Sequence, residues 1–396
     1  MSEEADGYDT TRIHVLEGCE AFRKRPGMYV GSIGERGLHQ LVFEVADRPV
    51  NEVLARRAGR VAVTLTADGR VRVSDDGPGV PVEAAGHAGD DGPGLESLLT
   101  RPHSGPGPRG CRVAPLGLFG IGPCVTNALS SRLTAEVRRD GVHWVQEYAC
   151  GVPITPPTAV GPATGSGTTL TFRPDADIFE TTEFSYTALA ERFRELAFLN
   201  RALDLTLTDE RAPGGRAPAG PRSERFHFPG GARDFVAFLD AASGTPLHRD
   251  VIGFERTAPR IGGTAEVALR WCASRAEQVR TFVNSLATDG GGTHLAGFRD
   301  GLAATVDAYA RRRGLLSPAE PGLGAERMSE GLTAVVSVKM DRPEFEGATR
   351  ATLSSAAAGV CVGEAVREGL GRWLEEHPEQ AVAVIGRFLG RPPSVV

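Results

Sequence analysis

Two periods of hydrophobic and polar residues run along this chain, and each predicts a different kind of element. From Leu38 to Ala55 the apolar residues recur every three to four positions, which predicts a helix with one buried stripe. From Val61 to Leu65 and from Val71 to Val73 apolar and polar residues alternate on either side of a turn that contains Gly69. This alternation is typical of strands and predicts a β-hairpin that delivers Asp75 at a strand end.

The same two periods predict most of the remaining elements. They give strands at 133–138, 144–148, 168–172 and 203–208, a helix at 184–196, then helices and strands in alternation at 235–239, 266–271, 279–284, 295–313 and 332–338, and a closing helix at 373–384. Residues 81–112 and 209–225 are rich in Gly and Pro and have no period, which predicts a loop and an exposed insertion. We therefore expect an α+β fold with two domains, 1–225 and 226–396.

Composition narrows the class of protein. With 396 residues, of which 41% are hydrophobic, the chain is long enough to bury two cores. No run approaches the roughly 20 apolar residues that span a bilayer, and the acidic opening lacks the basic start of a signal peptide, so we expect a cytoplasmic protein with no membrane contact. The net charge of −6 gives no general attraction for nucleic acid, so DNA contact requires a local arginine surface. The six cysteines lack metal-ligand spacing and are expected to be reduced thiols.

The polar face of the helix predicted at Leu38–Ala55 carries the first candidate chemistry. Its polar positions are Glu44, Arg48, Asn51 and Glu52. Glu44 and Asp47 are three residues apart and can point into one cavity. Taken alone, such a face is typical of a solvated helix surface. The motifs on either side of it favour a functional site.

Those motifs occur in a fixed order. The chain reads VLEGCEAFRKRPGMYVGS, then VFEVAD, then DDGPGVP, and further along GVPITP, FVNSLATDGGGTHLAGFR and EGLTAVVSVKM. This order resembles the amino-terminal ATPase and transducer regions of the gyrase B subunit, which belong to the type IIA DNA topoisomerases and have a GHKL-type α/β sandwich that binds ATP. The resemblance spans nearly all 396 residues. A histidine-kinase or chaperone relative would share the ATP fold but not the FVNSLATDGGGTH and transducer segments.

The resemblance implies ATP as the ligand and assigns residues to its adenine. Asp75 matches the aspartate that accepts the adenine exocyclic amine, and Thr168 matches the threonine beside it. Gly77, Gly79 and Pro81 complete the DxGxGxP pattern, in which the glycines let the backbone approach the ring. By itself a DxGxG segment indicates only a turn.

At the phosphates the resemblance implies a loop that leads into a helix. The binding residues in that loop are Gly117, Gly120, Ile121 and Gly122. The family's first glycine is Leu116 here and its histidine is Phe119. An ordinary junction between a strand and a helix, without tight phosphate contact, therefore stays an alternative.

Three further residues complete the implied nucleotide site. Tyr8 lies in a segment that matches the family's exchanged arm, which implies a homodimer that forms on nucleotide binding; a free polar tail is the alternative. Arg139 matches an arginine at the edge of the ATP pocket that contacts coumarin inhibitors. In the transducer region Arg350 matches the lysine that reaches the γ-phosphate, whereas Ala348 replaces a glutamine.

Glu44 matches the family's general base for ATP hydrolysis, and the implied metal ion is Mg2+. The asparagine that binds this metal in the family is Arg48 here, and a guanidinium has no lone pair for a metal. Arg48 has two alternatives, to pair with Glu44 or to lie over the phosphates as a fixed cation.

Pro49 disfavours helical angles at the residue before it. Pro78 replaces the arginine that pairs with the family's counterpart of Glu52, so Glu52 is expected to lose its partner.

By resemblance, the chain is the ATP-operated clamp of an ATP-hydrolysing DNA topoisomerase, with the gyrase A subunit, the gyrase B subunit and DNA as implied partners. No EGDSA-like segment of the family's DNA-cleavage module occurs in the 396 residues. We therefore expect that the chain cannot cut DNA alone and is at most a weak ATPase. The alternative is a stand-alone paralogue that binds ATP or an inhibitor and regulates or protects gyrase without efficient hydrolysis.

Overall fold

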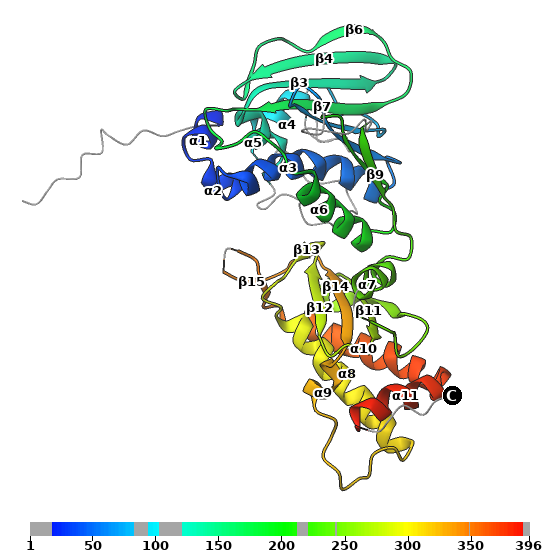
Figure 1. Cartoon of the computed structure of the whole chain (residues 1–396). Coiled ribbons are helices and arrows are strands. Elements are labelled where there is room, and N and C mark those ends of the chain that lie inside the picture. The colour runs from blue at the N-terminus through cyan, green and yellow to red at the C-terminus, as the bar shows by residue number, and fades with distance from the viewer. Residues whose placement is uncertain are drawn as a thin grey trace, which may run out of the picture. The chain divides into compact units, whose positions relative to one another are not determined.

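The computed structural model describes residues 18–82, 94–102, 121–211, 221–241, 244–347 and 349–390. These residues divide into two compact units (Figure 1). The first contains the described residues up to Leu189 together with Thr206–Glu224, and the second contains Ala190–Leu205 and the described residues from Arg225 onward. Each unit combines helices with a sheet, which confirms the predicted α+β class. No helix in the described part of the chain has the length and apolar content to cross a membrane.

The first unit is a sheet with α3 and α5 on one face (Figure 1). Its strand order is β5-β4-β3-β7-β2-β1-β8-β9, with β6 beside β4. The strands are β1 Val61–Leu65, β2 Val71–Asp75, β3 Ser130–Arg139, β4 Val142–Ala149, β5 Val152–Pro153, β6 Thr158–Pro162, β7 Gly167–Pro174, β8 Leu205–Asp209 and β9 Arg222–Phe226. The helices are α1 Cys19–Lys24, α2 Gly27–Val30, α3 Glu35–Leu54, α4 Leu95–Thr100, α5 Pro123–Ala128 and the start of α6 Tyr186–Leu199. The hairpin predicted at β1–β2 is confirmed, and the strands predicted at 133–138 and 144–148 pair as β3 and β4.

Helix α3 forms because its apolar stripe is buried. Leu38, Leu41, Val42 and Val45 are each at most 1% exposed, and burying a side chain of this size contributes about 1.5–3 kcal/mol. The helix continues across Pro49, although the proline ring removes one backbone hydrogen bond and disfavours helical angles at the residue before it. The predicted helix is therefore confirmed, and burial of its apolar face outweighs the cost of the proline.

One segment predicted as a loop contains a helix. Within residues 81–112, α4 forms because Leu95, Leu98 and Leu99 have helical spacing and are buried on one side. The surrounding Gly and Pro hide this short apolar pattern in the sequence. Residues 83–93 and 103–120 lie outside the described residues.

The insertion predicted between Asp209 and Arg225 is exposed at its end, as expected, but it is not irregular there. Strand β9 begins at Arg222 and lies beside β8 at the edge of the sheet. Phe226, the last residue of β9, is fully buried and anchors the strand. Residues 212–220 lie outside the described residues.

The closing helix predicted at 373–384 consists of parts of two helices. Helix α10 ends at Glu376, and α11 begins at Pro378. His377 between them has φ −129° and ψ 60°, outside the helical region. The break occurs because the residue before a proline avoids helical angles, whereas proline itself suits the first position of a helix.

The second unit has helices on both faces of a five-stranded sheet of order β10-β11-β14-β12-β13. Its strands are β10 Ile252–Ala258, β11 Gly263–Trp271, β12 Gln278–Val283, β13 Leu286–Ala287 and β14 Leu332–Lys339, with a separate pair β15 Phe345–Glu346 and β16 Thr352–Leu353. Its helices are the end of α6, then α7 Ala232–Asp240, α8 Thr293–Arg312, α9 Ala325–Ser329, α10 Ala356–Glu376 and α11 Pro378–Phe388. Successive residues of β14 alternate between two cores, because Val336 packs with α8 and α10 whereas Val335 packs with α6 and α7.

Candidate functional site

Glu44 lies in the middle of α3 and is fully buried. Its carboxylate accepts hydrogen bonds from Gln40 Nε2 at 3.1 Å and from the backbone N–H of Gly122 at 2.7 Å. Burial raises the pKa of Glu44 to about 7, although both hydrogen bonds act in the opposite direction. A carboxyl group with this pKa can gain or lose a proton near neutral pH, which is the property that a general base requires.

Two of the residues predicted for the phosphate loop are described. Ile121 is buried, and Gly122 directly precedes α5 with φ 88°, a backbone conformation that favours glycine. The N–H of Gly122 faces Glu44, so the start of α5 and the middle of α3 meet at one point. The predicted site residues Gly117, Gly120 and Tyr8 lie outside the described residues.

Arg48 turns away from Glu44. Its guanidinium lies 3.4 Å from Glu52 Oε1, one turn further along α3. Glu52 is held more closely by Arg57, which donates from Nε to Oε2 at 2.8 Å and from Nη2 to Oε1 at 3.2 Å. The prediction that Glu52 loses its partner through Pro78 is therefore wrong, and so is the pairing of Arg48 with Glu44. Sequence analysis does not find the Arg57 contact, because this residue follows the helix and has no periodic signal.

Asp75 is the last residue of β2, as the hairpin predicts. Its Oδ1 accepts the N–H of Gly77 at 2.9 Å. Burial raises the pKa of this carboxyl group, and the nearby charge of Arg48 opposes that change. On the neighbouring strand β7, Thr168 is buried, and its Oγ1 accepts the N–H of Val80 at 3.0 Å. The two predicted adenine residues therefore lie on adjacent strands.

The turn that follows β2 is held by Arg139 and by α4. Gly79 has φ 77°, and a Cβ atom there would lie 2.7 Å from the carbonyl oxygen of Arg138, so no side chain fits. Arg139 donates from Nη1 to the carbonyl oxygen of Gly79 at 2.9 Å. The carbonyl oxygen of Pro81 accepts the N–H of Leu95 at 2.8 Å, which ties the start of α4 to this turn.

These elements border a small cavity of about 10 Å³, which is room for about one water molecule. Its polar lining comes from Arg48, Asp75 and Thr168. Its apolar lining consists of Val45, Pro49, Val73, Val80, Leu98, Pro123 and Leu170. Pockets for small molecules usually measure about 300–1,000 Å³, so a nucleotide requires a large displacement of the lining. Sequence analysis does not find Leu98, because α4 was predicted as a loop.

Arg350 belongs to the second unit. It lies between β15 and β16 with φ 57°, and its contact with a phosphate stays a prediction. Ala348 lies outside the described residues.

The side chains around Glu44 do not fit a magnesium site. Mg2+ demands near-octahedral oxygen ligands, whereas the expected ligand position holds Arg48, whose guanidinium has no lone pair and points to Glu52. Among the described residues, no group of three or more His, Cys, Asp or Glu side chains could hold a metal ion. We therefore assign no metal ligand.

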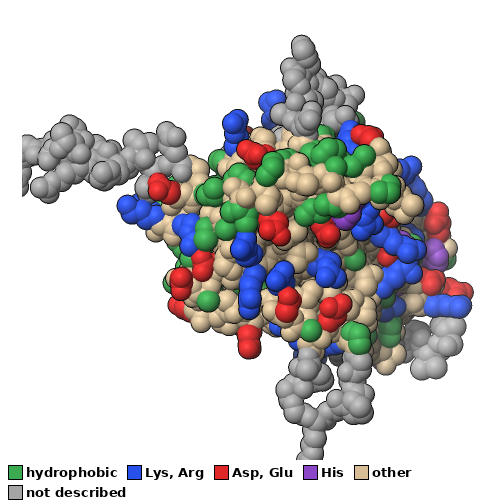
Figure 2. Space-filling model, turned by 90° about the horizontal axis from the view of Figure 1, so that it is seen from above, with side chains coloured by type: hydrophobic (Ala, Val, Ile, Leu, Met, Phe, Trp, Pro, Cys, Tyr) green, Lys and Arg blue, Asp and Glu red, His purple; other side chains and the backbone are tan. Residues whose placement is uncertain are grey.

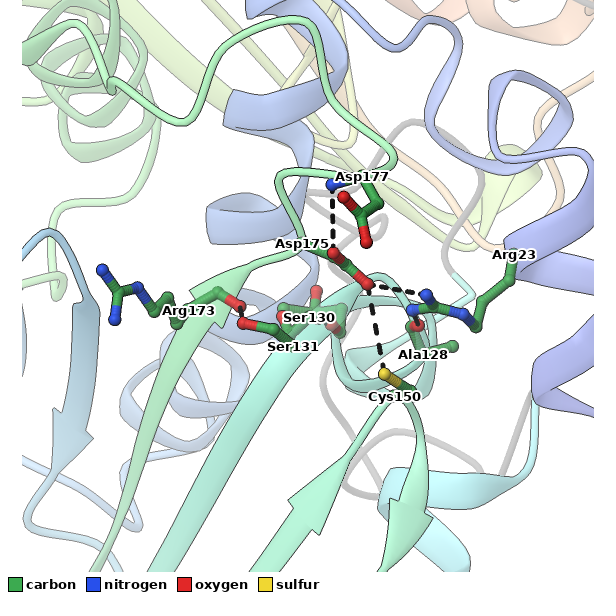
Figure 3. A network of polar contacts seen from close by, with 9 residues as sticks. Arg23, Ala128, Ser130, Ser131, Cys150, Arg173, Asp175 and Asp177 are labelled. Atoms are coloured by element: carbon green, nitrogen blue, oxygen red, sulfur yellow. Dashed lines mark hydrogen bonds and ion pairs between the residues drawn. The ribbon is translucent and has the colours of Figure 1, made fainter.

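A separate polar network lies around Asp175, just after β7 (Figure 3). Asp175 Oδ2 accepts from Arg23 Nη2 at 2.6 Å, and Oδ1 accepts the N–H of Asp177 at 3.1 Å. Arg23 also donates from Nη1 to the carbonyl oxygen of Ala128 at 2.9 Å, so the network joins α1, α5 and the end of β7. An open cavity borders Asp175 and Asp177. Because both oxygens of Asp175 are used within the protein, we interpret this network as structural support.

The face seen in Figure 2 carries basic, acidic and apolar side chains in close mixture. Among the exposed apolar residues of the chain are Val152, Ile154 and Val160 near β5 and β6.

Comparison with known proteins agrees with this architecture. The family model for DNA gyrase B matches residues 231–392. The chain is 43% identical over 390 residues to the DNA gyrase B protein of Streptomyces coelicolor, covering 96% of this chain and 56% of that protein. It is 42% identical over 389 residues to the novobiocin-resistant DNA gyrase B protein of Streptomyces niveus, covering 96% and 57%. Its structure matches the 43K ATPase domain of Thermus thermophilus gyrase B in complex with an aminocoumarin, with a TM-score of 0.77, 32% identity and 94% of each chain covered. The chain thus spans just over half the length of these curated relatives.

Proposed function

This chain belongs to the DNA gyrase B family, and from that premise we propose that it binds ATP in the cavity lined by Arg48, Asp75 and Thr168 and hydrolyses it slowly. One observation carries the proposal. Asp75, a partly buried carboxylate at the end of β2, lies beside Thr168 at the edge of a cavity whose floor is α3. A carboxylate that borders a cavity suits a ligand that offers N–H donors, such as the adenine exocyclic amine.

Each residue at this cavity has a proposed role in binding adenine. Asp75 accepts the exocyclic amine, and Thr168 contributes a hydroxyl group next to it. Gly77 and Gly79 would let the backbone approach the ring. A Cβ atom at Gly77 would also crowd the acceptor, since it would lie 2.9 Å from Asp75 Oδ1. Because the cavity is small, we expect Leu98 and the short helix α4 to move when the base enters.

For the phosphates, the central feature is the hydrogen bond between Gly122 and Glu44. The N–H of Gly122 is a donor that a phosphate oxygen can use, and it is now occupied by the Glu44 carboxylate. We infer that a bound polyphosphate displaces Glu44 from this N–H, which leaves the carboxylate free to accept a proton from water. Gly117, Gly120 and Ile121 around that loop, Tyr8 in the arm, Arg139 at the pocket edge and Arg350 in the second unit are proposed as further nucleotide contacts.

At the level of the assembly, we propose residues 1–225 as the ATP-binding domain with its arm, and residues 226–396 as the transducer. Nucleotide binding would then bring two copies together as a homodimer. We also propose that the chain acts on DNA topology together with a gyrase A subunit. This stays a proposal because the chain spans only 56% of the Streptomyces coelicolor protein.

The test is calorimetric titration of the full chain with a non-hydrolysable ATP analogue. Asp75→Asn removes the anionic acceptor and should weaken binding about tenfold or more, the usual worth of a hydrogen bond to a charged group. Asp76→Asn is the matched control, because Asp76 is exposed and only accepts the N–H groups of Gly59 and Arg60 at 2.7 and 2.9 Å. Equal binding by Asp75→Asn and the unaltered chain would show that adenine lies elsewhere.

A second candidate function is favoured by Arg48. With a guanidinium in place of the family's metal ligand, the chain would bind nucleotide as a stand-alone paralogue that regulates or protects a host gyrase without efficient hydrolysis. Two assays separate the two functions. ATP hydrolysis by this chain that is lost in Glu44→Ala would support the first function, whereas inhibition or protection of a complete gyrase in a supercoiling assay would support the stand-alone role.

A further inference from the structure

We propose that Arg48 replaces a divalent metal ion in the nucleotide site, so that this chain binds ATP in its metal-free form. The inference rests on the proposed function and concerns the same cavity. It starts from the finding that α3 presents a guanidinium to this cavity, where a metal site needs an oxygen ligand.

On α3, the carboxylates of Asp47 and Glu52 near Arg48 already accept hydrogen bonds. Both carboxylate oxygens of Glu52 accept hydrogen bonds from Arg57, and Oε1 also faces Arg48. Asp47 Oδ2 accepts from Asn51 Nδ2 at 3.3 Å. A magnesium ion needs several oxygen ligands in a strict geometry. It would have to break these bonds and approach a fixed positive charge, and both carry a free-energy cost.

Arg48 itself is able to turn toward a ligand. Its contact with Glu52 is 3.4 Å, longer than the roughly 2.7–2.9 Å of a strong charge-assisted hydrogen bond. When Arg48 moves, Glu52 keeps both hydrogen bonds from Arg57, so this buried carboxylate is not left unpaired. The side chain of Arg48 is only 22% exposed and lines the cavity together with Asp75. Its charge is therefore weakly screened by solvent.

The chemistry of the guanidinium suits this role. It carries five N–H donors in a planar fork and pairs with phosphate oxygens in two parallel hydrogen bonds. It brings one positive charge to the phosphates, whereas a magnesium ion brings two and also bridges them during transfer. The same substitution therefore explains nucleotide binding without metal and a low rate of hydrolysis.

The experiment is titration of the full chain with adenylyl imidodiphosphate, once in EDTA and once in excess Mg2+. For the unaltered chain we expect dissociation constants within about threefold of each other, less than 1 kcal/mol. Arg48→Met keeps the length of the side chain and removes the charge, so binding in EDTA should weaken about tenfold or more. Arg48→Lys keeps the charge but loses the planar fork, so its affinity should lie between those of Arg48→Met and the unaltered chain. Arg48→Asn restores an oxygen ligand, so Mg2+ should tighten its binding about tenfold.

Arg36→Met is the matched control, because Arg36 is exposed on the same helix; its binding should equal that of the unaltered chain in both buffers. Melting followed by circular dichroism checks that the Arg48 variants fold, which we expect because Glu52 keeps Arg57. Binding by the unaltered chain that appears only with Mg2+ would overturn this inference and leave the proposed ATP site intact. Unchanged affinity of Arg48→Met in EDTA would overturn it as well. No binding in either buffer would overturn both proposals.

Discussion

Replacing Glu44 by glutamine should stabilise this protein at neutral and alkaline pH, even though Glu44 is the proposed general base. The reason is that Glu44 is fully buried on α3 and accepts its hydrogen bonds from Gln40 and the N–H of Gly122. Neither partner carries a positive charge, so ionisation of Glu44 inside the fold is costly. Glutamine keeps the shape and can still accept from Gly122, but it has no charge to bury.

The size of the effect follows from the pKa of Glu44, which burial raises from 4.5 to about 7. Between these two pH values the folded state holds a proton that the unfolded state has lost, so the free energy of unfolding falls as pH rises. At about 1.36 kcal/mol for each pH unit, the loss reaches about 3 kcal/mol at pH 7 and does not grow above it. Glu44→Gln should therefore match the unaltered chain near pH 4.5 and exceed its stability by up to about 3 kcal/mol at pH 8.

Urea denaturation at pH 5, 6, 7 and 8, followed by circular dichroism, measures this difference. Glu35→Gln is the matched control, because Glu35 is exposed at the start of the same helix. Its effect should not change over this pH range. Two results would refute this reasoning: a Glu44→Gln variant that is less stable than the unaltered chain at pH 8, or an effect that is the same at every pH. Either result would mean that a partner outside the described residues neutralises the buried carboxyl group.

Three further predictions address turnover, inhibitors and the second unit. The ATPase rate of the unaltered chain should be low, should rise in Arg48→Asn with Pro49→Ser, and should fall about 10²- to 10⁴-fold in Glu44→Ala; a robust Mg2+-dependent rate in the unaltered chain would contradict this. Calorimetry should show that novobiocin binds the Pro78→Arg, Arg48→Asn double variant about one to two decades more tightly than the unaltered chain, because a hydrogen bond and a cation–π contact return. Equally tight binding by both proteins would show that these positions do not govern the pocket. Arg270→Met should lower the free energy of unfolding, measured in urea, by about 3–5 kcal/mol, because the fully buried carboxylate of Asp240 loses the partner that now donates at 2.5 Å. The control Arg299→Met removes an exposed ion pair with Glu277 and should lower it by no more than about 1 kcal/mol.

The sequence alone determined the elements whose signal is local. The helix at α3 and the hairpin β1–β2 follow from the period of apolar residues, because that period fixes which face of each element is buried. The same reasoning put Asp75 at the end of a strand, where the structure has it. Motif order identified the family over nearly the whole chain, which the comparisons confirm.

The tertiary structure alone decided which side chains meet. Glu44 and Gly122 are 78 residues apart, and Val80 and Thr168 are 88 apart, so no local period could pair them. The tertiary structure likewise decides in which direction the Arg48 side chain points. Helical spacing allows it to reach Glu44 or Glu52, and the choice of Glu52 depends on how the side chains around the cavity pack.

The acidity of Glu44 is the clearest case of a property that no sequence pattern contains. The sequence supplies a carboxyl group at a position that resembles the family's base. Its pKa of about 7 arises because the fold removes that group from water and gives it uncharged hydrogen-bond donors. Burial is a property of all the elements that surround α3 together, and for that reason only the folded chain sets it.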